Sequence, residues 1–266
     1  MRLERWGSTL RALASPTQAI PADLSLTSPP SDFPWKAERV IWQVEGEKTA
    51  THLLGSGWEC VGQELGLAYG IDLTPGTAPG LFPDQRENRM TLRSLKPQYL
   101  LNLFAHTCAF GVLAASEGAS TLNIDSSARA LARGKENYAR NRFEGSRHRF
   151  WTEDVRKVLP RLIRRGETFD TIILDPPTFA HGTKGRAFRI GQALEPLLLD
   201  CLTLAARRGR ILVSVNDTQI READLATTLQ SILTREQVRA RIQPGHRPPE
   251  VPPERMPATL WIFRED

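Results

Sequence analysis

The sequence has few cysteines, and their spacing shows no metal site or disulfide framework. Cys60, Cys108 and Cys201 are an odd number and lie far apart. No two of them have the Cys-x-x-Cys spacing of a zinc or redox site. Such usage is typical of free thiols in a reducing compartment, so we expect a cytoplasmic protein without a bound metal.

Long apolar runs are also missing. No stretch reaches the roughly 18–20 apolar residues that a membrane helix needs. The N-terminus, MRLERWGSTLRALASP, carries basic residues but no continuous apolar segment, so no signal peptide is expected. With 266 residues, 40% of them hydrophobic, the chain is long enough for one large domain or for one domain and a small one.

Positive charge is concentrated in one part of the sequence. The net charge is +5, but residues 129–165 hold twelve Lys and Arg against four Asp and Glu, or +8, which leaves −3 for the rest. A basic band of this kind suits a phosphate-rich partner such as RNA. On charge alone, a solvated helix face explains it equally well.

Composition divides the chain into three parts. Residues 1–35 are expected to form a flexible lead-in, because positions 15–34 are rich in Pro, Ser and Thr. Residues 36–77 contain short alternating runs broken by glycines, which predicts a small β-rich segment. Residues 78–266 are expected to form the main domain.

From Tyr99 onwards, short apolar strands alternate with helical patterns. Strands are predicted at 99–104, 121–125, 147–151, 169–175, 210–215, 237–242 and 258–263. Helices are predicted at 108–118, 126–141, 154–165, 186–207 and 219–234, the fourth with a bend at Pro196. Alternation of this kind predicts an α/β fold, a doubly wound and mostly parallel sheet with helices on both faces. Ligands of such sheets bind beyond the carboxyl ends of the strands.

The residues after the first three predicted strands suit an adenosine-containing ligand. The small-residue loop NLFAHTCAFG, 102–111, lets a ligand approach the backbone, and the helix that follows it favours a carboxylate. Asp125, about twenty residues further on, can accept hydrogen bonds from ribose hydroxyls. Glu153 or Asp154 can accept from an adenine amino group. Taken singly, Asp125 and Asp154 are more often acids that cap a helix, so the prediction depends on their occurring together.

The fourth strand ends in IILDPPTF, residues 172–179. Pro176 and Pro177 force the chain to leave the sheet in an extended conformation. That exit directs Asp175 and nearby carbonyl oxygens beyond the sheet, and Phe179 offers a flat face for stacking a base. The alternative is a proline stop followed by a buried Phe, which we consider less favoured.

Four stretches resemble the class I S-adenosylmethionine-dependent methyltransferases, and more narrowly the ribosomal RNA large-subunit methyltransferases of the RlmI and RlmK type. They are LFPDQRENR (81–89), NLFAHTCAFGV (102–112), NIDSSARALARGKENYARN (123–141) and LDPPTF (174–179). The resemblance spans about residues 78–216. It implies a Rossmann-like sheet of seven strands with the last one antiparallel.

The resemblance also implies the roles of particular residues. S-adenosyl-L-methionine is the expected cofactor, with its methionine part at the 102–108 loop, its ribose at Asp125 and its adenine near Asp154. Residues 175–179 are expected to face the methyl group and the target base. The expected cofactor-binding residues are Gln85, Arg86, Asn102, Phe104, Ala105, His106, Thr107, Asp125, Ser126, Asp154, Val155 and Asp175, and the expected catalytic residues are Asp175, Pro176, Pro177 and Phe179.

The sequence departs from that family in two places. Cys108 and Ala109 stand where relatives have paired glycines. Only segment 36–77 precedes the core, where many relatives carry an RNA-binding domain. For Gln85 and Arg86, a loop salt bridge is an equally favoured alternative.

The cysteines also bear on the chemistry. Methylation of a pyrimidine at carbon 5 needs a Cys that attacks the ring first, and neither DPPTF nor the fifth strand end, SVND (214–217), carries one. We therefore expect methylation of a nitrogen of an RNA base, with guanine N7 favoured, in ribosomal RNA. Residues expected to contact the RNA are Lys184, Arg186, Arg189 and Asn216.

Other functions remain open from the sequence. The methyl acceptor can be a protein side chain or a small molecule. The chain can also be an RNA-binding module with a degenerate cofactor site, because Thr107, Cys108 and Ala109 replace glycines. Hydride chemistry on a dinucleotide is weakened by the missing G-x-G-x-x-G motif.

Overall fold

The computed structural model describes residues 1–18, 20, 36–177, 179–180, 188–217, 220–252 and 256–265. For residues 179–180 and 188–193 it describes the backbone only. The chain forms two compact units, Met1–Leu81 and Phe82–Asp266, which are taken in turn.

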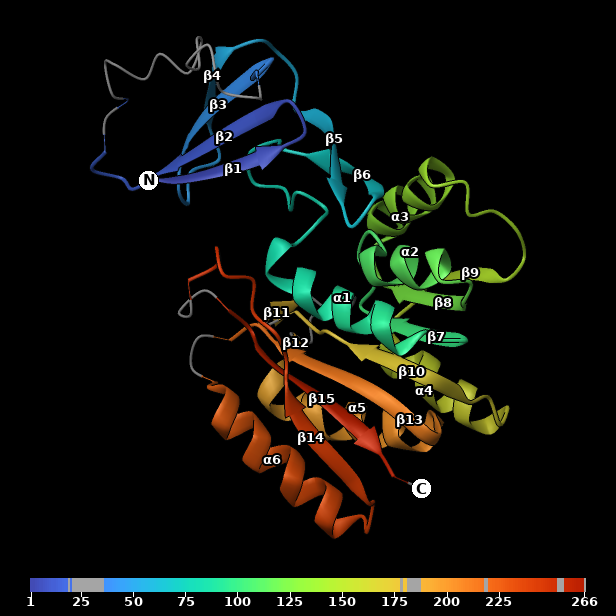
Figure 1. The fold of residues 1–266 in the computed structure, drawn as a ribbon. Helices are drawn as coiled ribbons and strands as arrows, with labels where there is room; N and C mark the ends of the chain where they lie inside the picture. Colours follow the sequence, from blue (N-terminus) through green and yellow to red (C-terminus); the bar gives the residue numbers. More distant parts are fainter. Residues whose placement is uncertain are drawn as a thin grey trace. The chain divides into compact units, whose positions relative to one another are not determined.

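The first unit is built from short β-strands (Figure 1). Strands β1 (Arg2–Trp6), β2 (Thr9–Ala14), β3 (Arg39–Val44) and β4 (Ala50–Leu54) form one sheet in that order, with β2 and β3 parallel. Strands β5 (Glu59–Glu64) and β6 (Leu67–Asp72) form a hairpin. The strand-rich character predicted for 36–77 is confirmed. The flexible lead-in predicted for residues 1–35 is wrong for its first part, since β1 pairs with β2, and β2 pairs with β3 and buries Leu10, Ala12 and Leu13.

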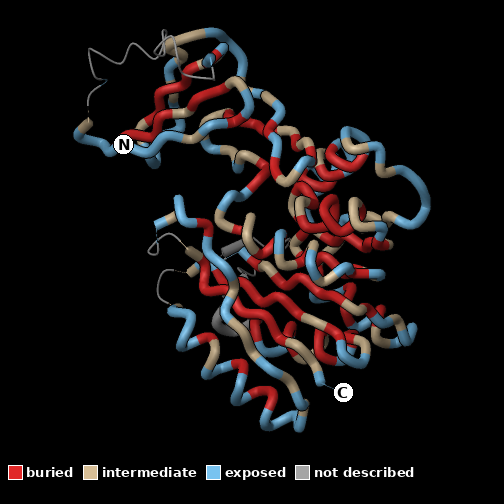
Figure 2. The backbone as a smooth tube through the Cα atoms, in the orientation of Figure 1, coloured by how far each residue is buried: buried red, intermediate tan, exposed pale blue. Residues whose placement is uncertain are grey.

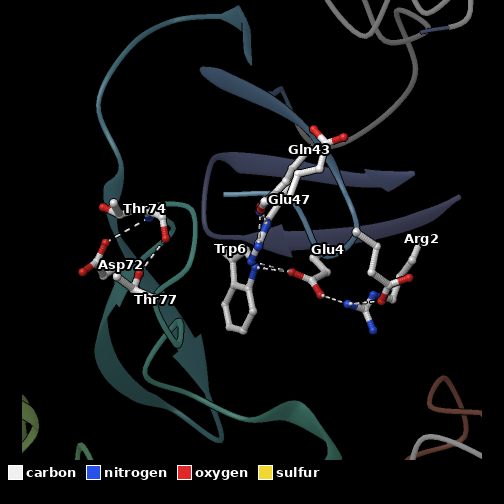
Figure 3. A network of polar contacts seen from close by, with 10 residues as sticks. Arg2, Glu4, Trp6, Gln43, Glu47, Asp72, Thr74 and Thr77 are labelled. Carbon is white, nitrogen blue, oxygen red and sulfur yellow. Dashed lines mark hydrogen bonds and ion pairs between the residues drawn. The ribbon is translucent and has the colours of Figure 1, made fainter. Parts of the chain in front are cut away.

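Polar contacts link the strands and turns of this unit (Figure 3). Glu4 accepts from the Trp6 indole at 3.3 Å and pairs with Arg2 at 3.1 Å, while the Gln43 amide donates to the Glu47 carbonyl at 2.8 Å. The first two contacts lie within β1, and the third closes the turn that follows β3. None of the expected cofactor-binding, catalytic or RNA-contacting residues lies in this unit.

The second unit holds a sheet of seven strands in the order β14-β15-β13-β10-β7-β8-β9. The strands span Tyr99–Leu103 (β7), Ser120–Asp125 (β8), His148–Thr152 (β9), Phe169–Leu174 (β10), Ala205–Val215 (β13), Ala240–Pro244 (β14) and Ala258–Arg264 (β15). The strands from β13 across to β9 are parallel, and β15 runs antiparallel between β13 and β14. This is the mostly parallel sheet with an antiparallel last strand that the sequence predicts.

Helices cover both faces of this sheet (Figure 1). One face carries α1 (Arg86–Leu95), which follows a 3₁₀ turn at Pro83–Gln85, together with α2 (Ala109–Ser116) and α3 (Ala128–Arg140). The other face carries α4 (Val155–Arg164), α5 (Ile190–Leu204) and α6 (Glu222–Arg235), whose apolar residues share one core with the strands. The strands Phe179–Ala180 (β11) and Phe188–Arg189 (β12) form a separate two-stranded ribbon.

The burial pattern explains why these segments fold as they do. Central strand β10 is buried almost throughout, as expected of a strand covered on both faces (Figure 2). Helix α4 buries Val155, Val158, Leu159 and Leu162, which recur at the spacing of one helix face. Its Asp154 caps the helix, because its side chain accepts from the Arg156 amide.

Helix α1 and the two ends of α5 differ from the prediction. Residues 86–95 form helix α1, which the sequence pattern did not predict, because charged residues dominate that stretch. The helix predicted for 186–207 begins at Ile190 and ends at Leu204, since Ala205–Arg207 already belong to β13.

Candidate functional site

The predicted residues gather where strands β7, β8, β9, β10 and β13 end, which we call the carboxyl edge. Because these five strands are parallel, their last residues lie along one side of the sheet. The loops that leave them contain the 104–108 stretch, Asp125, Asp154, Asp175 and Asn216. Ligands of open parallel sheets bind on this side.

The loop after β7 adopts left-handed backbone conformations without any glycine. Phe104, His106 and Cys108 have φ angles of 54°, 46° and 63°. Each such conformation costs a non-glycine residue about 1–2 kcal/mol, so the surrounding structure must hold it in place. Backbone conformations of this kind occur preferentially where a chain clamps a ligand.

Two side chains hold that loop. The Asp125 carboxylate accepts from the His106 amide at 2.8 Å through one oxygen and from the Ser127 amide at 2.8 Å through the other. The Asn137 amide of α3 donates to the Thr107 carbonyl at 3.1 Å. The predicted Asp125 therefore orders the predicted loop directly, while keeping lone pairs on both oxygens. Ser126 lies beside it and is exposed.

His106 presents a polar atom that has no internal partner. Its Nδ1 is buried and has no hydrogen-bond partner within the part of the chain that the structure describes. Burial lowers the pKa of the ring, so it is neutral near pH 7. The ring lies 5.4 Å from that of Phe82, centroid to centroid. A buried nitrogen of this kind in a ligand loop is suited to a bond with a bound molecule.

Not every predicted cofactor residue faces a ligand. The Asn102 amide is 2% exposed and donates to the Asn123 side chain at 3.0 Å. Asp154 caps α4 and pairs with Arg156 at 2.6 Å, which holds the pKa of its carboxyl below the usual value. Val155, next to it, is buried in the core. These observations favour structural roles for Asn102 and Asp154.

Asp175 lies at the end of β10 in an unusual electrostatic environment. Burial raises the pKa of its carboxyl to about 7; the negative charge of Asp84 adds to this effect, while a hydrogen bond from the Ser214 hydroxyl and the charge of Arg89 oppose it. At neutral pH this group therefore holds a proton about half of the time. A carboxyl with such a pKa at a ligand-binding edge is a candidate for acid–base chemistry. Pro176 is buried and Pro177 is exposed.

Gln85 and Arg86, the two cofactor-binding residues predicted in the stretch LFPDQRENR, make different contacts. Gln85 is 3% exposed, donates to the Ser214 hydroxyl at 2.9 Å and accepts from the Asn88 amide at 2.9 Å. Arg86 pairs with Glu87 at 3.1 Å and with Glu250 at 3.0 Å. The salt bridge weighed as the alternative for Arg86 is therefore present. Ser214, Asn88 and Glu250 were missed as site residues, because nothing in their local sequence indicates contacts across more than 120 positions.

The predicted RNA-contacting segment is described only at its ends. Strands β11 and β12 pair Phe179 with Arg189 through their backbones. Lys184 and Arg186 lie outside the described residues, and the side chains of Phe179 and Arg189 are not described. Asn216 directly follows β13 and is exposed. The roles predicted for these residues remain predictions.

The basic band of residues 129–165 lies on α3, β9 and α4. Three of its arginines are paired with carboxylates: Arg149 with Glu167, Arg156 with Asp154 and Arg161 with Glu153. Arg149, Arg161 and Arg165 also lie 5.5–6.0 Å from the ring of Trp151. Arg129 and Lys157, each near the N-terminus of its helix, are exposed at the carboxyl edge.

The S-adenosylmethionine that the resemblance implies fits this edge. Cys108 leaves the first amides of α2 without a side-chain cap, whereas Ser127 and Asp154 cap α3 and α4. Uncapped amides at a helix N-terminus suit a carboxylate. The unpartnered His106 Nδ1 and the remaining lone pairs of Asp125 add polar partners for the amino-acid and ribose parts.

Other kinds of site find less support. Within the described ranges, no three His, Cys, Asp or Glu residues are placed to hold a metal ion. None of the described helices has the length and apolar character needed to cross a membrane. An open groove of about 830 Å³ lies between α6 and strands β14 and β15, but none of the predicted residues lines it.

Curated relatives share part of this chain. A Bacillus subtilis protein named "Putative ribosomal RNA large subunit methyltransferase YwbD" is 36% identical over 159 residues, which are 59% of this chain and 40% of that protein. "Ribosomal RNA large subunit methyltransferase I" of Shewanella denitrificans is 39% identical over 120 residues, 44% of this chain and 30% of that protein. The matches thus span well under half of these relatives' length.

Solved structures share the fold. "SMU.776, a putative methyltransferase complexed with SAH" superposes with a TM-score of 0.82 at 22% identity, over 98% of this chain and 70% of that chain. A tRNA m1G37 methyltransferase of M. jannaschii does so with a TM-score of 0.65 at 14% identity, over all of this chain and 75% of that one. A family model of S-adenosylmethionine-dependent methyltransferases matches residues 44–260. With this match over most of its length, and with the sheet and edge described above, the chain belongs to the S-adenosylmethionine-dependent methyltransferase family.

Proposed function

We propose that this protein transfers a methyl group from S-adenosylmethionine to a nitrogen of a base in large-subunit ribosomal RNA, with guanine N7 as the favoured atom. The observation that carries the proposal is the pair of curated relatives, at 36% and 39% identity, that are both named as large-subunit ribosomal RNA methyltransferases. The exposed basic residues of the carboxyl edge are consistent with an RNA substrate.

The state of the cysteines supports a nitrogen rather than pyrimidine carbon 5 as the acceptor. A covalent mechanism needs a thiolate within reach of the base. Burial raises the pKa of the Cys108 thiol well above its usual value, and it also raises that of Cys201, inside α5. Cys60 belongs to the first unit. None of the three is an activated nucleophile at the carboxyl edge.

Asp175 supplies the group that orients the base. When bound, S-adenosylmethionine provides an electrophilic methyl group, and a nitrogen lone pair can take it directly without covalent catalysis. In its protonated form Asp175 can donate to the O6 atom beside guanine N7, and in its ionised form it can accept from an N–H. The raised pKa makes both forms accessible near neutral pH.

Product identification tests this function. Purified protein is incubated with radiolabelled S-adenosylmethionine and with ribosomal subunits or total RNA from cells that lack the protein. The labelled nucleosides are then separated after digestion. We expect label in 7-methylguanosine, and an Asp175→Ala variant should give far less. Binding of S-adenosylhomocysteine is measured in parallel by calorimetry.

The other outcomes are informative. Label in 5-methylcytidine would overturn the non-covalent mechanism. Label in another N-methylated base would keep RNA and change the atom. Cofactor binding without any RNA label would move the substrate to a protein or a small molecule. Absence of cofactor binding would support the RNA-binding module.

A further inference from the structure

A series of hydrogen bonds runs from the loop between β14 and β15 to Asp175. The His246 backbone amide donates to the Asn88 side chain at 3.2 Å, and the Asn88 amide donates to Gln85 at 2.9 Å. Gln85 in turn donates to the Ser214 hydroxyl at 2.9 Å. Ser214 follows Val213, the strand partner of Leu174, so it stands beside Asp175, whose carboxyl its hydroxyl faces. Four segments far apart in the sequence are thereby joined.

The hydrogen bonds of this series can run in only one direction. A backbone N–H can only donate, so the Asn88 atom that faces His246 must be its oxygen. The nitrogen of Asn88 then faces Gln85, whose oxygen accepts it, and the Gln85 nitrogen faces Ser214. Side-chain amides can otherwise be placed in either of two orientations. Here one backbone amide determines both of them.

The direction of these hydrogen bonds determines whether the Ser214 hydroxyl can donate its hydrogen to Asp175. Its oxygen accepts from Gln85, which leaves its single hydrogen free to be donated. Asp175 is the charged acceptor next to it, and hydrogen bonds to charged groups are the stronger ones. The Thr259 hydroxyl lies 3.3 Å from the Ser214 oxygen and 3.2 Å from the Pro257 carbonyl, so its single hydrogen can go to only one of them. One Asp175 oxygen is thus held as an acceptor towards Ser214, so a proton on this carboxyl sits on the other oxygen.

Burial keeps this series of hydrogen bonds from rearranging. Asn88 and Ser214 are 0% exposed and Gln85 is 3% exposed. Breaking one link would leave buried polar groups without partners, at a cost of about 1–3 kcal/mol each. The loop also depends on Gly245, because a Cβ there would lie 2.9 Å from the Asn88 oxygen and 2.8 Å from Thr259.

We infer that Gln85, Asn88 and Ser214 are positioning residues that fix the hydrogen bonding of Asp175, and that Gln85 is not a cofactor ligand. Both polar ends of the Gln85 amide have a partner inside the protein and the residue is only 3% exposed, which leaves its side chain little access to a bound molecule. The role in methyl transfer rests on the proposed function. The positioning itself is a property of the free protein and is measured without substrate.

Carbon-13 NMR of the Asp175 carboxyl, titrated over pH, tests the inference. Ser214→Ala removes the donor and should raise the pKa of Asp175 by about 1, since one pKa unit is about 1.4 kcal/mol. Ser214→Thr should restore the wild-type value. Gln85→Met should give a smaller rise and leave the dissociation constant of S-adenosylhomocysteine within about twofold. Thr171→Val removes an equally buried hydroxyl from β10 and should change neither quantity.

A matched pair of variants at His246, where the series of hydrogen bonds begins, leaves the buried side chains unchanged. His246→Pro removes the backbone N–H, whereas His246→Ala keeps it and loses only an exposed side chain. Only the proline variant should move the pKa of Asp175. Unchanged titration in Ser214→Ala and Gln85→Met would overturn the inference. So would a large loss of S-adenosylhomocysteine binding in Gln85→Met, which would make Gln85 a cofactor residue. Neither result depends on whether RNA is the substrate.

Discussion

The thiol of Cys108 occupies the space that a side chain at position 134 would need. A Cβ added to Gly134 would lie 2.5 Å from the Cys108 sulfur and 3.3 Å from the carbonyl carbon of Thr107. Cys108 stands where the resemblance implies a glycine, and it keeps a left-handed backbone with φ of 63°. The facing helix α3 therefore provides the room that a loop glycine would otherwise provide.

Gly134→Ala should destabilise the protein, although alanine is the better helix former. Overpacking against Cys108 and the loop backbone is expected to cost about 1–3 kcal/mol and to weaken S-adenosylmethionine binding. Thermal unfolding and calorimetry measure the two effects. Adding Cys108→Ala to the variant should recover most of both losses. A stable Gly134→Ala protein with normal binding would show that the contact is unimportant.

Asp125→Asn should weaken cofactor binding more than it weakens the fold. An amide can accept only through its oxygen, so one of the two backbone amides now bound, His106 or Ser127, would lose its partner. Asp170→Asn is the control: the Asp170 carboxylate also accepts from two backbone amides, those of Gln98 and Tyr99, at the opposite edge, but through a single oxygen that an amide keeps. Calorimetric titration with S-adenosylhomocysteine should show a loss of about tenfold or more for Asp125→Asn only. Equal losses in both variants would contradict a ligand role for the loop.

Asp175→Asn should make the protein more stable at pH 8. The pKa of this carboxyl is about 7 in the folded protein and 3.8 ordinarily, so the folded state binds more protons between these values. In the wild type, the contribution of this carboxyl to the free energy of unfolding is fully present below about pH 4 and is lost as the pH rises through about 7. The variant lacks this loss and should gain roughly 2–4 kcal/mol at pH 8, because each tenfold change in proton affinity is worth about 1.4 kcal/mol. Urea unfolding at pH 5 and pH 8 checks this, and a gain independent of pH would contradict it.

A variant without cysteine should still transfer methyl groups. Combining Cys60→Ser, Cys108→Ala and Cys201→Ala removes every thiol of the sequence. Buried Cys201 packs in the core, so its loss should cost about 1 kcal/mol of stability. We expect kcat within about threefold of wild type at a temperature where both proteins are folded. Loss of activity in a folded variant would revive covalent catalysis.

Charge reversal at the carboxyl edge should weaken RNA binding. The double variant Arg129→Glu with Lys157→Glu changes exposed residues near the N-termini of α3 and α4. Arg207→Glu with Arg208→Glu changes the net charge equally, but at the start of β13 on the opposite edge. Filter binding over a range of salt concentrations should show lower affinity and a shallower salt dependence for the first pair only. Equal effects would indicate that net charge alone attracts the RNA.

Several parts of the second unit could be predicted from the sequence. Strands such as 169–174 contain a short apolar run, here IIL, and helices such as 155–164 repeat apolar residues at helical spacing, so local pattern suffices for them. Alternation then predicts a parallel sheet, and parallel strands place the residues at their ends on one edge. Asp125 and Asp175 were found for this reason.

What only the tertiary structure decided involves contacts between distant segments. Strand β2, which carries β1 at its other side, pairs with β3 across the Pro-rich stretch, which composition alone assigns to a lead-in. Gln85 and Arg86 look alike as motif residues, yet one is buried against Ser214 and the other is paired with Glu250. The raised pKa of Asp175 reflects its burial and the positions of Ser214, Asp84 and Arg89, which lie about 40 to 90 positions away in the sequence. The local sequence therefore determined which elements form and which side chains stand at the strand ends. Packing decided which of those side chains are free to bind a ligand, because partners and solvent exposure exist only in the folded chain.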